Sequence, residues 1–171
     1  MPQIVLIGPP GSGKSTIGKA LAKFLSLSFI DTDSSVERTS GRKIADIFVD
    51  QGEEFFRDLE YQALSKALES EKSVVSLGGG APIPERAQLL LQEIKSPIVF
   101  LDISLSAAAP RVGFNRDRPL LLGNPRAQWQ ALYEIRRPIY EKLATTVVKV
   151  DSLTTDQVIQ EILKGTSLEK H

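Results

Sequence analysis

Residues 8–16 read GPPGSGKST, a stretch whose residue types and spacing suit the binding of a polyphosphate. The stretch satisfies the Walker A pattern, in which four variable residues separate a first glycine from Gly-Lys-Ser or Gly-Lys-Thr. Its glycines permit backbone angles closed to other residues, so that successive N–H groups can point at phosphate oxygens. In such a loop Lys14 bridges the β- and γ-phosphates, and the Ser15 hydroxyl binds Mg²⁺.

The surroundings of this loop fit the same interpretation. An apolar strand is predicted before it at residues 3–8, and an amphipathic helix after it at Lys14–Leu25. The start of that helix adds the partial positive charge of a helix N-terminus. We therefore expect a nucleotide-binding loop rather than a plain glycine-rich turn. Its contacts with the nucleotide are expected from Gly11, Ser12, Gly13, Lys14, Ser15 and Thr16.

Two aspartates that end predicted strands could supply the carboxylate that a metal beside this loop needs. Asp102 follows four apolar residues, as a Walker B acid does, whereas Asp31 ends the strand reached directly after the helix of the loop. Either side chain could instead cap the helix that follows it. Sequence spacing alone leaves the choice between them open.

Three further residues could help to bind the molecule that accepts the phosphate. Asp33 lies two residues after Asp31, on the same side of an extended segment, so it can reach a hydroxyl next to a metal held at Asp31. Arg57 lies three residues before Glu60 in a predicted helix, a spacing that lets the acid orient the guanidinium. An ordinary surface ion pair is the alternative interpretation of those two.

Three consecutive glycines, Gly78, Gly79 and Gly80, follow a predicted buried strand. They cost conformational entropy unless another group must approach the backbone closely. Ligands bind at the carboxyl ends of the strands in open α/β sheets. The position of the triplet therefore favours contact with a substrate over a simple tight turn.

Residues 111–126 read RVGFNRDRPLLLGNPR and combine arginines with glycines and prolines between helical stretches. A solvated surface loop is one interpretation of this composition. Connections of this length are usually functional, and many enzymes complete their site by closing a lid. We therefore expect a mobile lid over an anionic ligand.

Composition and charge exclude several classes of function. The 171 residues include 21 basic and 21 acidic side chains, so bulk attraction to nucleic acid or to a membrane surface is not expected. Cysteine is absent and the lone histidine is His171, which leaves no thiolate chemistry and no imidazole base inside the fold. No apolar run reaches the length of a membrane span, and the first strand starts too close to Met1 for a signal peptide. We expect a cytoplasmic protein.

The elements that position these residues alternate between short apolar strands and longer amphipathic helices, the pattern of an α/β protein with a parallel sheet. Because the strands are continuous apolar runs, we expect them to be buried on both faces. They are predicted at residues 3–8, 28–31, 73–78, 97–102 and 146–151. Besides Lys14–Leu25, helices are predicted at Gly52–Glu69, at Gln128–Leu143 with a kink or restart at Pro138, and from about Thr154.

Six segments together resemble the shikimate kinases, a family of small-molecule kinases. They read GPPGSGKST, DTD, GEEFFRDLE, SLGGG, RDRPLL and RRPIY, and their order and spacing are similar to the pattern of that family. The resemblance covers essentially the whole chain. It implies one domain over residues 1–171 with the three-layer P-loop kinase fold of the nucleoside monophosphate kinase-like group. Its five-stranded parallel sheet would have the order 2-3-1-4-5 and be flanked by helices, with a substrate-binding region at about 33–60 and the lid at about 111–126.

The resemblance also implies a reaction and its participants. Shikimate kinases transfer the γ-phosphate of ATP to the 3-hydroxyl of shikimate, a cyclic triol with a carboxylate, in the pathway to chorismate and the aromatic amino acids. ATP is then the co-substrate and Mg²⁺ the cofactor. The family inclines us to expect a monomer, whose partners are shikimate and ATP, with no nucleic acid and no membrane.

The residue roles follow the same resemblance. Asp33 would bind the ring hydroxyls and is the candidate base. Arg57 and Arg136 would pair with the substrate carboxylate. Ser15 would bind Mg²⁺ directly and Asp31 through water, which favours Asp31 over Asp102. The remaining implied contacts are ring-lining Gly78, Gly79 and Gly80, Arg118 reaching from the lid to the phosphates, and Arg111 beside the adenine. Lys14, Asp33 and Arg118 would be the catalytic residues.

Two departures from the family pattern affect single residues. The stretch after the last strand, VDSLTTDQV, lacks the usual proline near the adenine, which leaves Leu153 and Thr154 as candidate contacts. Arg137 adjoins Arg136, and the R-x-P-x-Y spacing selects Arg136 for the substrate.

Three other functions fit the sequence less well. A kinase for another hydroxylated acid, such as gluconate, would keep Lys14 and Ser15 without needing Asp33, Arg57, Gly79 and Arg136 together. A non-catalytic nucleotide-binding module predicts the loss of Lys14, Asp33 or Arg57, and all three are present. A nucleic-acid-binding ATPase is disfavoured by the size and the balanced charge.

Overall fold

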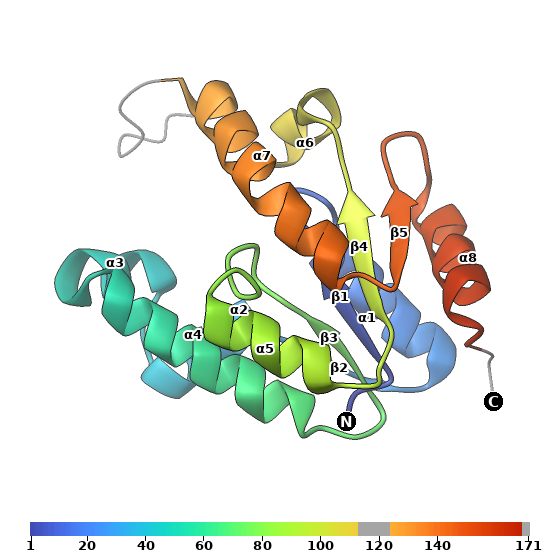
Figure 1. The fold of residues 1–171 in the computed structure, drawn as a ribbon, viewed down its shortest axis with the longest axis horizontal. Helices are drawn as coiled ribbons and strands as arrows, with labels where there is room; N and C mark the ends of the chain where they lie inside the picture. The colour runs from blue at the N-terminus through green and yellow to red at the C-terminus, as the bar shows by residue number, and fades with distance from the viewer. Residues whose placement is uncertain (113–123, 169–171) are drawn as a thin grey trace.

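The computed structural model describes residues 1–112 and 124–168, and Figure 1 shows its arrangement. Five parallel strands form one sheet in the order β2-β3-β1-β4-β5, which confirms the predicted topology. Every strand begins or ends within two residues of its predicted bounds. The strands are β1 (Ile4–Ile7), β2 (Ser28–Asp31), β3 (Ser73–Ser76), β4 (Ile98–Asp102) and β5 (Thr146–Lys149).

Burial differs between the centre and the edges of the sheet. All residues of β1, β3 and β4 are buried, as their apolar runs predicted. The expectation is wrong for β2 and β5, which are the edge strands and remain partly exposed. An edge strand lacks a neighbour on one side, so its apolar residues are covered on fewer sides than those of a central strand.

Eight helices lie in the described part of the chain, and four of them confirm predictions. The helix α1 (Lys14–Leu25) matches its predicted bounds, and α4 (Glu53–Leu68) and α8 (Thr155–Thr166) differ from theirs by a residue. The helix α7 (Pro125–Leu143) continues through Pro138, so the predicted alternative of a restart there is wrong, while a kink stays a prediction. The others are α2 (Thr32–Ser40), α3 (Ile44–Gln51), α5 (Glu85–Glu93) and α6 (Leu105–Val112).

The predicted lid at 111–126 falls largely on residues 113–123, which lie outside the described residues, as does Arg118. Its flanks are helical. Arg111 belongs to the last turn of α6. The next helix, α7, begins at Pro125. Its N-cap is Asn124, whose side chain accepts hydrogen bonds from the N–H groups of Arg126 and Ala127. None of the helices among the described residues is long and apolar enough to cross a membrane.

Helices cover both faces of the sheet, which gives three layers. In Figure 1, α1 lies behind the strands and α8 lies to the right of β5, packed against α1 and β5, while α5 and α7 lie in front with α4 beside them. The main hydrophobic core is built around β1, β3 and β4 and takes side chains from both helical layers. A second, smaller cluster of Val36, Ile47 and Phe56 lies apart from it and joins α2, α3 and α4. The helices around residues 33–60 therefore have a core of their own.

Candidate active site

The phosphate loop connects β1 to α1 at the carboxyl edge of the sheet. Gly11 and Gly13 have φ values of 84° and 91°, a left-handed region that favours glycine. Gly8 has no room for a side chain either, because an added Cβ would lie 2.6 Å from the Leu101 carbonyl oxygen. Gly13 is also the N-cap of α1, so the N–H groups of the first turn have no side-chain cap and remain available to an anion.

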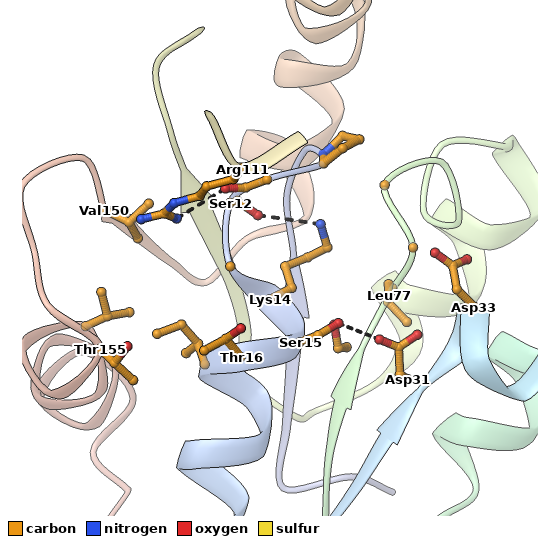
Figure 2. Close-up of a pocket in the computed structure, with 18 of the residues that line it drawn as sticks. Ser12, Lys14, Ser15, Thr16, Asp31, Asp33, Leu77, Arg111, Val150 and Thr155 are labelled. Atoms are coloured by element: carbon orange, nitrogen blue, oxygen red, sulfur yellow. Dashed lines mark hydrogen bonds between the residues drawn. The ribbon is translucent and has the colours of Figure 1, made fainter. Parts of the chain in front are cut away.

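Lys14 lies inside this loop, and its ammonium group donates to the carbonyl oxygens of Gly8 and Pro9 at 2.7 and 3.0 Å. Burial lowers the pKa of Lys14 to about 8, against the nearby carboxylates of Asp33 and Asp31, which raise it. The site thus contains a cation that has lost most of its hydration and lies beside two acids (Figure 2).

Ser15 and Asp31 form the candidate magnesium site. The Ser15 hydroxyl donates to Asp31 Oδ2 at 2.6 Å, and both side chains line the cavity shown in Figure 2. Hydroxyl and carboxylate oxygens suit Mg²⁺, which commonly takes its other ligands from phosphates and water. The described residues contain no group of three or more His, Cys, Asp or Glu side chains that could hold a metal.

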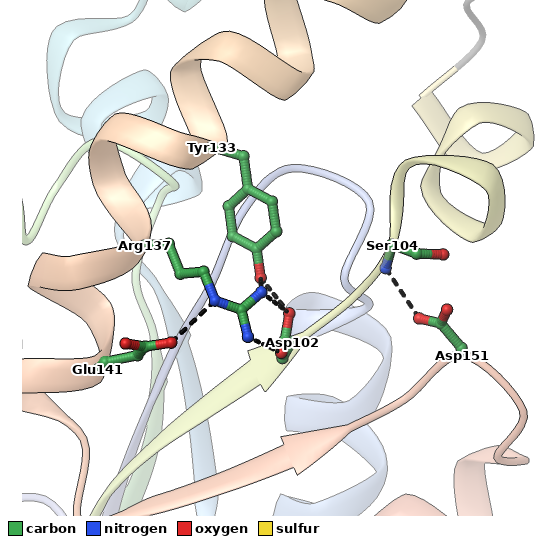
Figure 3. Close-up of polar contacts among 6 residues, drawn as sticks. All are labelled: Asp102, Ser104, Tyr133, Arg137, Glu141 and Asp151. Atoms are coloured by element: carbon green, nitrogen blue, oxygen red, sulfur yellow. Dashed lines mark hydrogen bonds and ion pairs between the residues drawn. The ribbon is translucent and has the colours of Figure 1, made fainter.

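Asp102 belongs to a different environment. Arg137 contacts both of its carboxylate oxygens, at 3.0 and 2.6 Å, and the Tyr133 hydroxyl also donates to it (Figure 3). These residues line a second hollow on the α7 side of β4, which shares no lining residue with the cavity of the phosphate loop. The structure therefore places Asp31, and not Asp102, beside Ser15.

Asp33 lies in the first turn of α2, next to the glycine triplet, so the expectation that it continues the extended segment of Asp31 is wrong: the chain turns into a helix at Thr32, with Asp31 as its N-cap. An added Cβ on Gly78 would lie 2.4 Å from Asp33 Oδ1, and the Gly78 N–H donates to the Thr32 hydroxyl at 3.0 Å. Burial and the neighbouring Asp31 raise the pKa of Asp33, while Lys14 opposes the shift. The carboxylate is thus more basic than an exposed aspartate, as a proton acceptor near neutral pH should be.

Arg57 faces the same triplet from α4. Its guanidinium donates to Glu60 at 2.7 Å and lies 3.6 Å from Glu53, and an added Cβ on Gly80 would lie 2.5 Å from Arg57 Nη1. Glu60 is buried, which raises its pKa against the effect of Arg57. The pair is therefore not an ordinary surface ion pair, since one of its two members is inside the protein.

The two adjacent arginines of α7 point to different places. Arg136 Nη1 would lie 3.6 Å from a Cβ on Gly79, whereas Arg137 is engaged by Asp102 and by Glu141. Each glycine of the triplet thus faces a different predicted substrate contact: Gly78 faces Asp33, Gly79 faces Arg136, and Gly80 faces Arg57. The approach is tight at Gly78 and Gly80, whereas at Gly79 the tighter neighbour of an added Cβ would be Pro10 Cδ at 3.1 Å.

A cavity of about 670 Å³ extends along the phosphate loop, from Asp33, Gly78 and Gly79 at one end to α8 at the other. Gly80, Arg57 and Arg136 are not among its lining residues. At the α8 end Arg111 donates to the Gly11 carbonyl at 3.2 Å, and Leu153 lines the wall. Thr154 is not part of the lining, because its side chain caps α8 by accepting from the Gln157 N–H at 3.2 Å. Lining residues that the sequence reasoning missed are Pro10, Ile17, Ser76, Leu77, Val150, Thr155 and Val158.

Three of these omissions, Ile17, Val150 and Val158, are apolar residues outside the six motifs. Val150 and Leu153 follow the last strand, the region that parallel-sheet topology places at the ligand edge. That rule could have singled out Val150. Nothing in the sequence indicates Val158, whose place in the wall depends on how α8 packs against α1.

The fold, the glycine-rich loop and the lysine buried in it define the class of protein: a P-loop kinase. The family model for shikimate kinases matches residues 10–166. A shikimate kinase from Thermobifida fusca is 45% identical over 163 residues, which cover 95% of this chain and 94% of that relative. The chain belongs to the shikimate kinase family and is an ATP-dependent kinase.

Solved structures agree with this assignment. A shikimate kinase from Acinetobacter baumannii in complex with shikimate has a TM-score of 0.88 and 32% identity, covering 96% of this chain and 92% of that one. A gluconokinase from Sinorhizobium meliloti has a TM-score of 0.59 and 22% identity over 96% of this chain and 91% of its own. The likeness to the gluconokinase shows a shared fold.

Proposed function

We propose that this protein transfers the γ-phosphate of ATP to the 3-hydroxyl of shikimate, giving shikimate 3-phosphate and ADP. The main support for this proposal is that Asp33, Arg57 and Arg136, which belong to three different helices, lie around the glycine triplet beside the phosphate loop. A ring with adjacent hydroxyls and one carboxylate has the matching chemistry. Its hydroxyls would face Asp33, and its carboxylate would face the two guanidinium groups.

The phosphate loop would hold and neutralise the nucleotide. Backbone N–H groups at the start of α1 face the phosphates, and Lys14 supplies a positive charge that little water screens. Ser15 and Asp31 would hold Mg²⁺, which when bound screens negative charge on the transferred phosphoryl group. The lid residue Arg118 lies outside the described residues, and its contact with the phosphates stays a prediction.

Asp33 would orient the acceptor hydroxyl and receive its proton. Its raised pKa makes it a better proton acceptor, and the positive charge of the nearby Lys14 opposes that shift. Phosphoryl transfer needs little covalent help from the protein, so most of the effect of Asp33 would come from alignment of the hydroxyl with the γ-phosphate.

The test is ADP release from MgATP by the purified protein with shikimate, with gluconate and with neither acid. We expect ADP release that depends on shikimate, and ³¹P and ¹H NMR of the product should place the phosphate on the 3-hydroxyl. Turnover stimulated by gluconate instead would contradict the acceptor while keeping the kinase. A monomeric state and a cytoplasmic location also stay predictions, the first of them open to size-exclusion chromatography with light scattering.

A further inference from the structure

Tyr140 is a fully buried residue of α7 that the proposed reaction leaves without a task. Its relative exposure is 0%, and its hydroxyl donates to the carbonyl oxygen of Gly79 at 2.6 Å. This contact joins two segments that are 61 residues apart in the chain, the middle of the glycine triplet and the second half of α7. A short hydrogen bond inside the protein fixes the distance between those two segments.

The same hydroxyl lies next to Arg136, one helical turn before Tyr140. Residues at positions i and i+4 of a helix share a face, and the Arg136 guanidinium approaches Gly79 from that face. Burial raises the pKa of Tyr140 to about 12, although the positive charge of the nearby Arg136 favours the phenolate. At neutral pH the phenol therefore stays protonated and remains a donor to Gly79.

Gly79 is a sensitive point for such a bond. A Cβ added there would lie 3.1 Å from Pro10 Cδ of the phosphate loop and 3.6 Å from Arg136 Nη1. Its two neighbours face Asp33 and Arg57 at still shorter distances. A shift of the triplet would thus change its spacing to the phosphate loop and to all three acceptor contacts together.

We propose that Tyr140 is a positioning residue of the acceptor site, whose hydroxyl fixes the Gly79 carbonyl and the Arg136 guanidinium relative to each other. This inference rests on the proposed function, because it assigns the aligned groups to the acceptor. Tyr140 acts through these two groups and touches neither phosphate nor the reacting hydroxyl. The tyrosine that ends R-x-P-x-Y therefore has a task distinct from that of the arginine which begins it.

The test compares Tyr140→Phe with the matched variant Tyr133→Phe. Both tyrosines are buried residues of α7, and each loses only a hydroxyl, but Tyr133 donates to Asp102 in the other hollow. In Tyr140→Phe we expect the KM for shikimate to rise about 5- to 10-fold, the scale of one lost hydrogen bond. The KM for ATP should stay within about twofold of the wild-type value, and Tyr133→Phe should change neither KM.

A double-mutant cycle separates positioning from a general loss of structure. If Tyr140 acts partly through Arg136, then Tyr140→Phe should raise the shikimate KM less in an Arg136→Lys background than in the wild type. Additive effects of the two substitutions would remove Arg136 from the proposal. Melting temperatures of both phenylalanine variants show how much stability each hydroxyl contributes.

Two results would overturn the inference: an unchanged shikimate KM in Tyr140→Phe, or equal changes in the KM for shikimate and for ATP. Either one leaves the proposed function standing if the wild type turns over shikimate. If the wild type instead uses another acid, the proposed function fails, and the same variants are compared with that acid. The two failures are therefore distinguishable.

Discussion

At the scale of single residues, the site depends on charges that folding brings out of water. Lys14 has its pKa lowered to about 8 by burial, whereas burial and Asp31 raise that of Asp33. Folding therefore disfavours the charged form of the lysine. Because its folded pKa lies below the ordinary value of 10.5, its contribution to stability improves as the pH rises from about 8 to 10.5. Phosphate binding, in contrast, favours the protonated form of Lys14.

Nucleotide affinity should consequently fall at alkaline pH. Phosphate binding favours protonated Lys14, so above pH 8 the protein must take up a proton when ATP binds. We expect a roughly constant Kd up to about pH 7.5 and a rise of up to about tenfold per pH unit beyond pH 8. Calorimetry in two buffers of different ionisation enthalpy measures both the Kd and the proton uptake. Lys14→Met should bind weakly and take up no proton, and a flat Kd through pH 9.5 in the wild type would contradict the argument.

At the scale of elements, α7 connects separate parts of the site. Trp129 donates to the Pro10 carbonyl of the phosphate loop at 3.1 Å, Tyr140 reaches Gly79, and Arg137 pairs with Asp102 at the end of β4. These contacts lie along one side of the helix, which continues through Pro138 as one element. One missing backbone N–H weakens a helix, but packing along its length can compensate for that loss.

Substitutions of the two adjacent arginines of α7 should therefore have different effects. We expect Arg136→Ala to raise the KM for shikimate about 10- to 100-fold, since it removes a proposed charged partner of the shikimate carboxylate. Arg137→Ala should leave that KM within about twofold and lower the free energy of unfolding by about 1–2 kcal/mol, because Asp102 stays buried without its cation. The loss is moderate because 40% of the Arg137 side chain is exposed. Steady-state kinetics and urea unfolding measure the two effects, and a raised shikimate KM in Arg137→Ala alone would reverse the assignment.

The sequence determined the elements better than it determined their surroundings. Period and motif predicted five strands and the nucleotide loop, because glycines and apolar runs carry local signals. Asp31 and Asp102 could not be separated by spacing, since the difference lies in what each aspartate meets in space: Ser15 for the first, Arg137 and Tyr133 for the second. The role of Tyr140 was equally hidden, because its partner Gly79 is 61 residues away.

At the scale of the whole molecule, two hydrophobic clusters of unequal size support different parts of the site. The main core surrounds the central strands and holds the phosphate loop in place. The small cluster of Val36, Ile47 and Phe56 supports α2, α3 and the start of α4, which carry Asp33 and Arg57. A small core gives little free energy against local opening, so the acceptor side should open more readily than the nucleotide side.

Hydrogen exchange should reveal this difference directly. We expect the amides of α2 and α3 to exchange at least about tenfold faster than those of β1, β3 and β4, and shikimate to slow them selectively. Exchange followed by mass spectrometry on peptides covering residues 32–51 measures both effects. Ile47→Ala should speed exchange in these two helices while leaving β1 unchanged. Equal protection across the chain would show that the two clusters open as one unit.

The position of Trp129 has a practical consequence. It is the only tryptophan in the chain, it is 8% exposed, and its indole N–H is bonded to the phosphate loop. Indole emission responds to the polarity and hydrogen bonding around the ring, so the single tryptophan is a fluorophore bonded to the nucleotide side of the site, and it can be excited apart from the three tyrosines. Stopped-flow fluorescence can therefore follow nucleotide arrival in the unlabelled protein, with no background from a second tryptophan elsewhere.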